Sequence, residues 1–172
     1  FNIDYEGSIN KDKTAVLRVF AKVFYNHLGF FGSNLKVAML EQYITQQGKM
    51  DEFCRLIEEK KGKPWTEVRK AFAFNGKFIK PALAEALDIS EEDANNWFND
   101  KSATEFSVSQ LVEDINAYVS TKPANFRLLF MVDEAGQYVG TDTDMLLNLQ
   151  SLVEKIGSEC RGKVWVVCTG QE

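Results

Sequence analysis

The chain has 172 residues, of which 45% are hydrophobic and 26% are charged, a composition that excludes a disordered protein. Its formal net charge of −5 argues against nucleic-acid binding through bulk electrostatic attraction. No run of about 18 apolar residues occurs, which excludes a spanning helix, and three widely spaced cysteines indicate reduced thiols in a cytoplasmic protein.

The first predicted element is a core strand within residues 1–6. Because the chain starts inside one strand and stops directly after another, we expect a piece excised from a longer protein. Residues 12–121 are then predicted to form a helical insertion, because apolar residues recur there at helical spacing. The expected helices cover residues 14–28, 34–47, 50–61, 64–74, 77–88, 90–99 and 107–121.

The last part of the chain, residues 126–172, predicts an α/β unit. The apolar run Leu128–Val132 is typical of a strand buried on both faces. A helix follows, with Thr141 and Asp144 at its start, and Val164–Cys168 forms the final strand. The predicted fold class is therefore α/β, with a three-stranded parallel sheet and a large all-helical insertion between its first two strands.

Two adjacent acids, Asp133 and Glu134, come directly after the Leu128–Val132 strand. Ligands of parallel α/β sheets bind at the carboxyl ends of the strands, which is where these acids are expected. One carboxylate could hold Mg²⁺ through water while the other orients an attacking water, as in the Walker B arrangement of nucleotide hydrolases. The alternative is that the pair only begins a solvated loop.

The final strand ends in the polar residues Thr169 and Gln171, which are expected at the same edge of the sheet. A polar side chain there could contact a γ-phosphate or the attacking water, as a sensor does; the alternative is an ordinary transition from strand to loop. The phosphate-binding loop is missing, because no G-x-x-x-x-G-K-[ST] occurs in the sequence.

Four stretches together resemble the BREX phage-defence P-loop ATPase family (BrxC/PglY): "NID" at the start, "KGKPWTEVR", "LLFMVDEAGQYVG" with "MLLNLQSLVEKIG", and "GKVWVVCTGQE". The resemblance implies part of an AAA+ (ASCE-like) P-loop domain. It further implies that Asp133 holds Mg²⁺ through water, that Glu134 is catalytic, and that Thr169 or Gln171 is the sensor, Thr169 also contacting the nucleotide. Asn2 would restrain the catalytic glutamate.

The same resemblance implies Mg²⁺ and ATP as cofactors of the full-length parent, in the cytoplasm. Its partners would be other phage-defence proteins, with DNA a further candidate through the full complex and no membrane. Because the Walker A loop is absent, we expect neither cofactor nor ATPase activity in the isolated segment. The implied strand order places 164–168 at an unpaired edge, which predicts an edge-strand dimer of the segment.

Two alternative functions remain open. The first is a non-enzymatic helical interaction module that shares only the α/β scaffold. The second is a DNA-binding module, because residues 82–98 have the rhythm of a helix-turn-helix. The acids of its second helix would repel phosphates, however, so that packing of two helices is the favoured interpretation.

Overall fold

The structure, a computed structural model, describes residues 1–3, 14–100 and 106–170, and the chain divides into two compact units. The α/β unit comprises Phe1–Phe24 and Phe106–Glu172, and the helical unit comprises Tyr25–Glu105. The α/β unit is thus assembled from two stretches of chain that the helical unit separates in sequence.

The α/β unit contains a two-stranded parallel sheet formed by β1 (Leu128–Val132) and β2 (Val164–Cys168). Leu128 lies opposite Val164, and Val132 lies opposite Cys168. The helix α10 (Thr143–Glu159) connects the two strands, as a parallel pair requires. The structure therefore confirms the predicted α/β class, in the coarse sense of a mostly helical chain with a small parallel sheet.

The predicted first strand is reduced to one bridge in the described residues, so the three-stranded sheet is not formed there. Asn2 makes a single parallel bridge with Asp133. Asp133 N donates to Phe1 O (2.9 Å), and Ile3 N donates to Asp133 O (3.3 Å). Because these bonds lie beyond the end of β1, the overlap is too short for a regular ladder.

The N-terminal residues and β2 nevertheless pair with opposite edges of β1. Leu128 N and Val132 O make hydrogen bonds with the residues that flank β2. Met131 O and Asp133 N make hydrogen bonds with Phe1 instead. Alternate residues of a strand direct their backbone groups to opposite edges. The order across the unit is therefore residues 1–3, then β1, then β2.

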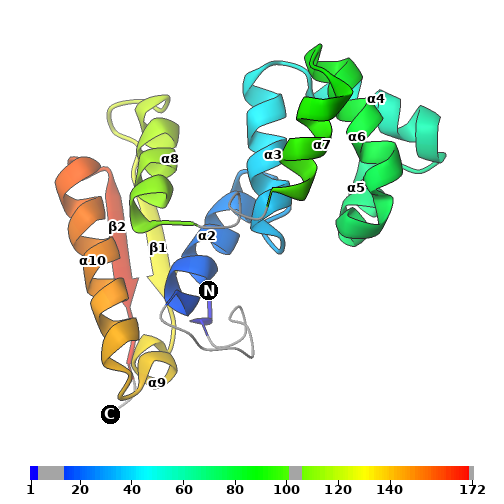
Figure 1. The fold of residues 1–172 in the computed structure, drawn as a ribbon. Helices are drawn as coiled ribbons and strands as arrows, with labels where there is room; N and C mark the ends of the chain where they lie inside the picture. Colours follow the sequence, from blue (N-terminus) through cyan, green and yellow to red (C-terminus); the bar gives the residue numbers. More distant parts are fainter. Residues whose placement is uncertain (4–13, 101–105, 171–172) are drawn as a thin grey trace. The chain divides into compact units, whose positions relative to one another are not determined.

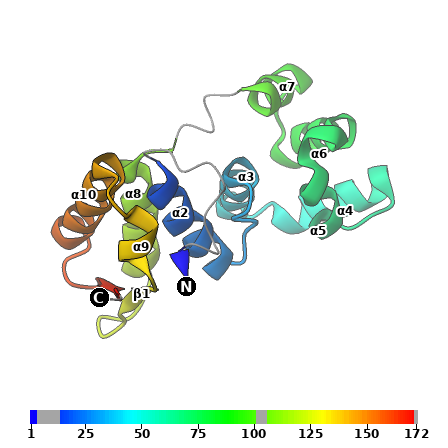
Figure 2. The same cartoon turned by 90° about the horizontal axis from the view of Figure 1, so that it is seen from below.

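Three helices cover one face of this sheet: α2 (Ala15–His27) through its first ten residues, α8 (Val108–Ser120) and α10 (Figures 1 and 2). The α2 ring of Phe20 packs against Phe130 of β1, with 5.3 Å between ring centroids. Ser107 caps α8 by accepting from Gln110 N, as its sequence predicts. The core of this unit thus lies between the helices and the even-numbered side of β1.

The opposite face of the sheet is open in the described part of the unit. Four apolar side chains lie on it in two cross-strand pairs, with exposed fractions between 43% and 63%: Leu129 with Trp165, and Met131 with Val167. The expectation of a strand buried on both faces is therefore wrong, because no described helix packs against this side (Figure 2). We call these four residues the open sheet face.

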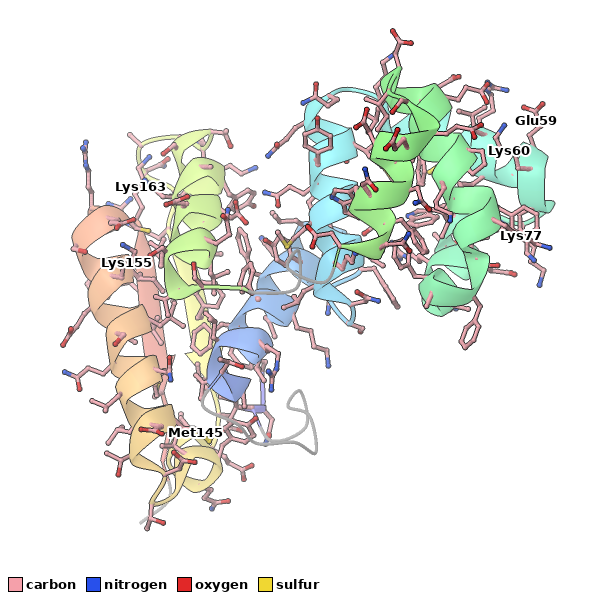
Figure 3. The ribbon with its side chains drawn as sticks, in the orientation of Figure 1. Glu59, Lys60, Lys77, Met145, Lys155 and Lys163 are labelled. Atoms are coloured by element: carbon pink, nitrogen blue, oxygen red, sulfur yellow. The ribbon has the colours of Figure 1, made fainter. Side chains whose placement is uncertain are left out.

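The helical unit is built from short helices around a core of its own. They are α3 (Leu35–Gln46), α4 (Met50–Lys61), α5 (Trp65–Val68), the 3₁₀ helix η1 (Arg69–Asn75), α6 (Gly76–Leu87) and α7 (Glu91–Asn99). Their apolar faces meet in one buried cluster that includes Phe53, Trp65 and Leu83. Charged side chains such as Glu59 and Lys77 project outward (Figure 3).

Two local interpretations are corrected. The helix expected over 64–74 breaks at Ala71 (φ −119°, ψ 45°), where the Asn75 amide donates to the carbonyl oxygens of Val68 and Ala71 and replaces backbone bonds. The stretch after the acids, for which a solvated loop was the alternative interpretation, forms a short helix, α9 (Ala135–Val139). No helix in the described residues has the length and apolar character needed to cross a membrane.

Candidate functional site

The candidate site lies where β1 and β2 end at the same edge of the sheet. Thr169 directly follows the last paired residue of β2, and its N–H donates to Val132 O at 2.9 Å. The Thr169 hydroxyl donates to Asp133 Oδ1 at 2.5 Å and accepts from Glu134 N at 3.3 Å. One hydroxyl therefore fixes one Asp133 oxygen and the backbone of the next residue.

Glu134 has a backbone conformation that is uncommon for a residue with a side chain. Its φ of 60° and ψ of 27° lie in the left-handed region, which costs about 1–2 kcal/mol for a non-glycine residue. This conformation ends the line of β1 and lets α9 begin at Ala135. Such conformations cluster at functional sites, where the surrounding structure enforces them.

Asn2 reaches the same place from the other edge of β1. Its Nδ2 donates to Glu134 Oε2 at 2.5 Å. The bridge between Asn2 and Asp133 holds the backbone that presents this amide. Four of the five residues singled out from the sequence, Asn2, Asp133, Glu134 and Thr169, are thus brought together, while Gln171 lies outside the described residues.

The two carboxylates make no ion pair with any described Lys or Arg. The described residues also contain no cluster of three or more His, Cys, Asp or Glu that could enclose a metal ion. Mg²⁺ needs no such cluster, because it is often held by one or two carboxylates together with waters and substrate phosphates. Asp133, which uses only Oδ1 in the bond with Thr169, fits that manner of binding.

The short helix α9 anchors the chain directly after the two acids. Tyr138 and Val139 are buried, and Gln137 N and Tyr138 N both donate to Glu134 O at 3.1 Å. The packing of α9 therefore fixes the residue that carries the Glu134 carboxylate. Sequence reasoning missed this helix, because five residues that begin beside a strand are too few to show a helical period.

A second buried carboxylate, Glu41 of α3, was also missed from the sequence. Its side chain is 1% exposed and accepts from Phe31 N (2.6 Å), Trp65 Nε1 (2.6 Å) and Arg69 Nη1 (2.8 Å). These donors come from the loop before α3, from α5 and from η1. Glu41 thus joins the elements of the helical unit, and its paired state indicates a structural role.

Residues 82–98 do form two helices with a short turn, as the helix-turn-helix pattern predicted. The turn between α6 and α7 begins at Asp88 in the left-handed conformation (φ 53°), and Ser90 caps α7 by accepting from Asp93 N. The first turn of α7 carries Glu91, Glu92 and Asp93, all exposed. A recognition helix that starts with three carboxylates would repel the phosphates of DNA.

No protein-family model matches the chain, and no solved structure matches it significantly.

Proposed function

We propose that this chain carries the Walker B and sensor elements of a P-loop ATPase of the AAA+ type, from a BREX-like phage-defence system. In this proposal Asp133 holds Mg²⁺ through water and Glu134 takes a proton from the attacking water. Thr169 is the sensor, and Asn2 restrains Glu134. The proposal rests on the sequence resemblance and on the geometry of the strand ends.

The observation that carries the proposal is the convergence of four polar side chains at one sheet edge. Asp133 and Glu134 come after one strand, Thr169 comes after its parallel neighbour, and Asn2 arrives from the third chain segment. Parallel α/β sheets bind their ligands at this edge. A solvated loop would not require a hydroxyl bonded to one acid and an amide bonded to the other.

The order of the segments supports the same proposal. Residues 1–3, β1 and β2 lie side by side in that order, with all described pairing parallel. The resemblance implies this order for strands 2, 3 and 4 of an AAA+ sheet. The open sheet face and the second edge of β2 are then surfaces that further parts of a P-loop domain would cover.

The phosphate-binding loop must come from outside these residues, because the sequence contains no G-x-x-x-x-G-K-[ST]. That loop supplies backbone donors and a lysine to the phosphates. We therefore expect the 172-residue chain alone to bind Mg-ATP weakly or not at all in titration calorimetry. Micromolar affinity of this chain would contradict the assignment, because it would place a complete nucleotide site within it.

A further inference from the structure

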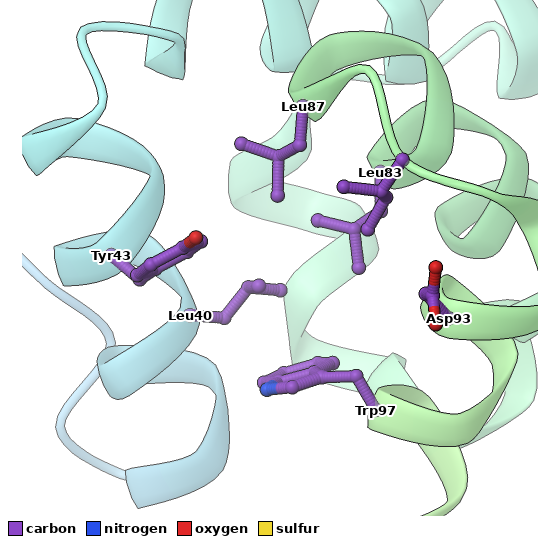
Figure 4. Close-up of a pocket in the computed structure, with 7 residues that line it drawn as sticks. Leu40, Tyr43, Leu83, Leu87, Asp93 and Trp97 are labelled. Atoms are coloured by element: carbon purple, nitrogen blue, oxygen red, sulfur yellow. The ribbon is translucent and has the colours of Figure 1, made fainter.

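The helical unit has an apolar groove between α3, α6 and α7 that no proposed catalytic residue uses. It has a volume of about 300 Å³ and is shown in Figure 4. Leu40 and Tyr43 of α3 face Leu83 and Leu87 of α6 across it, and Trp97 of α7 lies along one side. Ile89 and Asp93 complete the lining.

The apolar groups at the rim of the groove are accessible to a partner. Tyr43 is 52% exposed and Ile89 is 38% exposed, although both are large hydrophobic residues. Below them Leu40 and Leu83 are almost fully buried and belong to the core of the unit. The groove therefore has a buried apolar floor and an exposed apolar rim, a combination that marks interaction sites.

The turn and the helix that follow Leu87 beside the groove carry acidic side chains. Residues 88–100, the turn and α7, contain five acids and neither Lys nor Arg: Asp88, Glu91, Glu92, Asp93 and Asp100. Asp93 itself lines the groove, and its carboxylate accepts from the Ser90 hydroxyl at 2.6 Å, which holds it at the rim.

Three described lysines border α7. Lys77 and Lys80 surround a separate hollow with Glu91 and Glu92, where Lys80 Nζ donates to Asn95 Oδ1 at 2.8 Å. Lys36 lies beside Trp97, and its charge is already engaged. Its Nζ lies 5.0 Å from the centroid of the Trp97 ring and donates to the carbonyl oxygens of Phe98 (2.9 Å) and Asp100 (2.5 Å). Glu91 and Glu92 thus share their side of α7 with two lysines, whereas Asp93 is the charged residue that lines the groove itself.

This combination selects one kind of occupant. The acids repel nucleic acid and acidic peptides. The groove is at the lower limit of small-molecule site volumes and offers few polar groups to orient such a ligand. An amphipathic helix that lays apolar side chains into a groove and presents Lys or Arg to acids on its border satisfies both features.

We propose that this groove is a docking site for a basic amphipathic helix of a partner protein. Apolar side chains of that helix fill the space between Tyr43, Leu87 and Trp97. Its basic side chains face Asp93, which lines the groove, and Asp88 in the turn before α7. This function is independent of nucleotide hydrolysis and belongs to the helical unit alone.

The test uses the whole chain and a fluorescein-labelled synthetic helical peptide of about 18 residues, with Leu on one face and Lys on the other. Fluorescence anisotropy should show saturable binding that weakens as the salt concentration rises. A peptide of the same composition with its Leu positions scrambled should bind at least about tenfold more weakly. A peptide with Glu in place of Lys should not bind.

Two variants locate the binding. Ile89→Lys and Tyr43→Lys each place a cation on an exposed rim position and should each weaken binding at least about tenfold. Phe74→Lys is the matched control, because Phe74 is a 90% exposed apolar residue of the same unit that does not line the groove. Phe74→Lys should bind the peptide as tightly as the unsubstituted chain does. Circular dichroism verifies that all three variants fold.

Three results would overturn the proposal. The first is no binding of the Leu–Lys peptide. The second is equal binding of the ordered and scrambled peptides, which would show attraction by charge alone. The third is an unchanged affinity in both rim variants, or an equal loss in Phe74→Lys, since either would place the contact elsewhere.

Discussion

At the scale of single residues, the Thr169 hydroxyl is the contact that joins the ends of the two strands. It donates to Asp133 Oδ1, and Thr169 N donates to the residue before Asp133. A hydrogen bond to a charged acceptor contributes more to stability than one between neutral groups, but both side chains here are exposed, which reduces the gain.

This contact predicts a measurable coupling between the two side chains. In a double-mutant cycle of Thr169→Val and Asp133→Asn, measured by urea unfolding of the chain, we expect a coupling energy of up to about 1 kcal/mol. Pairing Asp133→Asn with Thr45→Val, an exposed threonine of α3, should give no coupling. Equal values for the two cycles would show that the Thr169–Asp133 bond does not exist in solution.

Glu41 is a buried charged residue whose replacement should cost much of the chain's stability. Glu41→Gln removes the negative charge opposite Arg69 and replaces one of the two accepting oxygens by an NH2 group that faces a donor, so we expect a loss of about 3–5 kcal/mol in the free energy of unfolding. The matched control is Glu52→Gln, whose exposed pair with Arg55 should contribute nothing measurable. Similar stabilities of the two variants would contradict the described position of Glu41.

At the scale of elements, the regular periods of the sequence predicted most of the fold. Both strands of the sheet have the predicted bounds, and helices such as α4 and α8 differ from prediction by a residue at most. In these elements the apolar residues form a continuous run or recur at the spacing of a helix, so the local sequence alone indicates the type of element and its bounds. The break at Ala71 was not predictable, because it depends on how the Asn75 side chain bonds in the folded unit.

The candidate site was predictable to a similar extent. Asp133, Glu134 and Thr169 could be placed at one edge, because the carboxyl ends of parallel strands meet there. The left-handed backbone of Glu134 and the helix α9 could not be predicted, because no pattern in the local sequence requires them. Burial of β1 on both faces was predicted wrongly, because an apolar run cannot show whether a second layer is present to cover it.

The open sheet face predicts different costs for neighbouring residues of β1. Phe130→Ala should destabilise the unit by about 3–5 kcal/mol, because its buried ring packs against Phe20. Met131→Ala should cost less than about 1 kcal/mol, because that side chain is already largely in solvent. Chemical denaturation of the two variants compares them, and equal losses would mean that the open face is covered in solution.

At the scale of the whole molecule, the second edge of β2 is unpaired in the described sheet, which has only two strands. Association of the chain through residues 164–168 stays a prediction. Trp165 and Val167 of that strand also lie on the open sheet face, so both the edge and the face offer apolar contacts. In the proposed P-loop domain, the same surfaces would be covered by the part that carries the phosphate-binding loop.

The measurement that tests the central proposal most directly is ATP hydrolysis by the proposed parent protein, in which this chain is joined to a phosphate-binding loop. Glu134→Gln keeps the shape of the side chain but cannot accept a proton, so we expect turnover to fall at least about 100-fold while Mg-ATP remains bound. The control is Glu113→Gln, which replaces an exposed acid on α8 and should leave the rate of ATP hydrolysis unchanged. Turnover of Glu134→Gln at the parent rate would contradict the assignment of Glu134 and, with it, the proposed Walker B site.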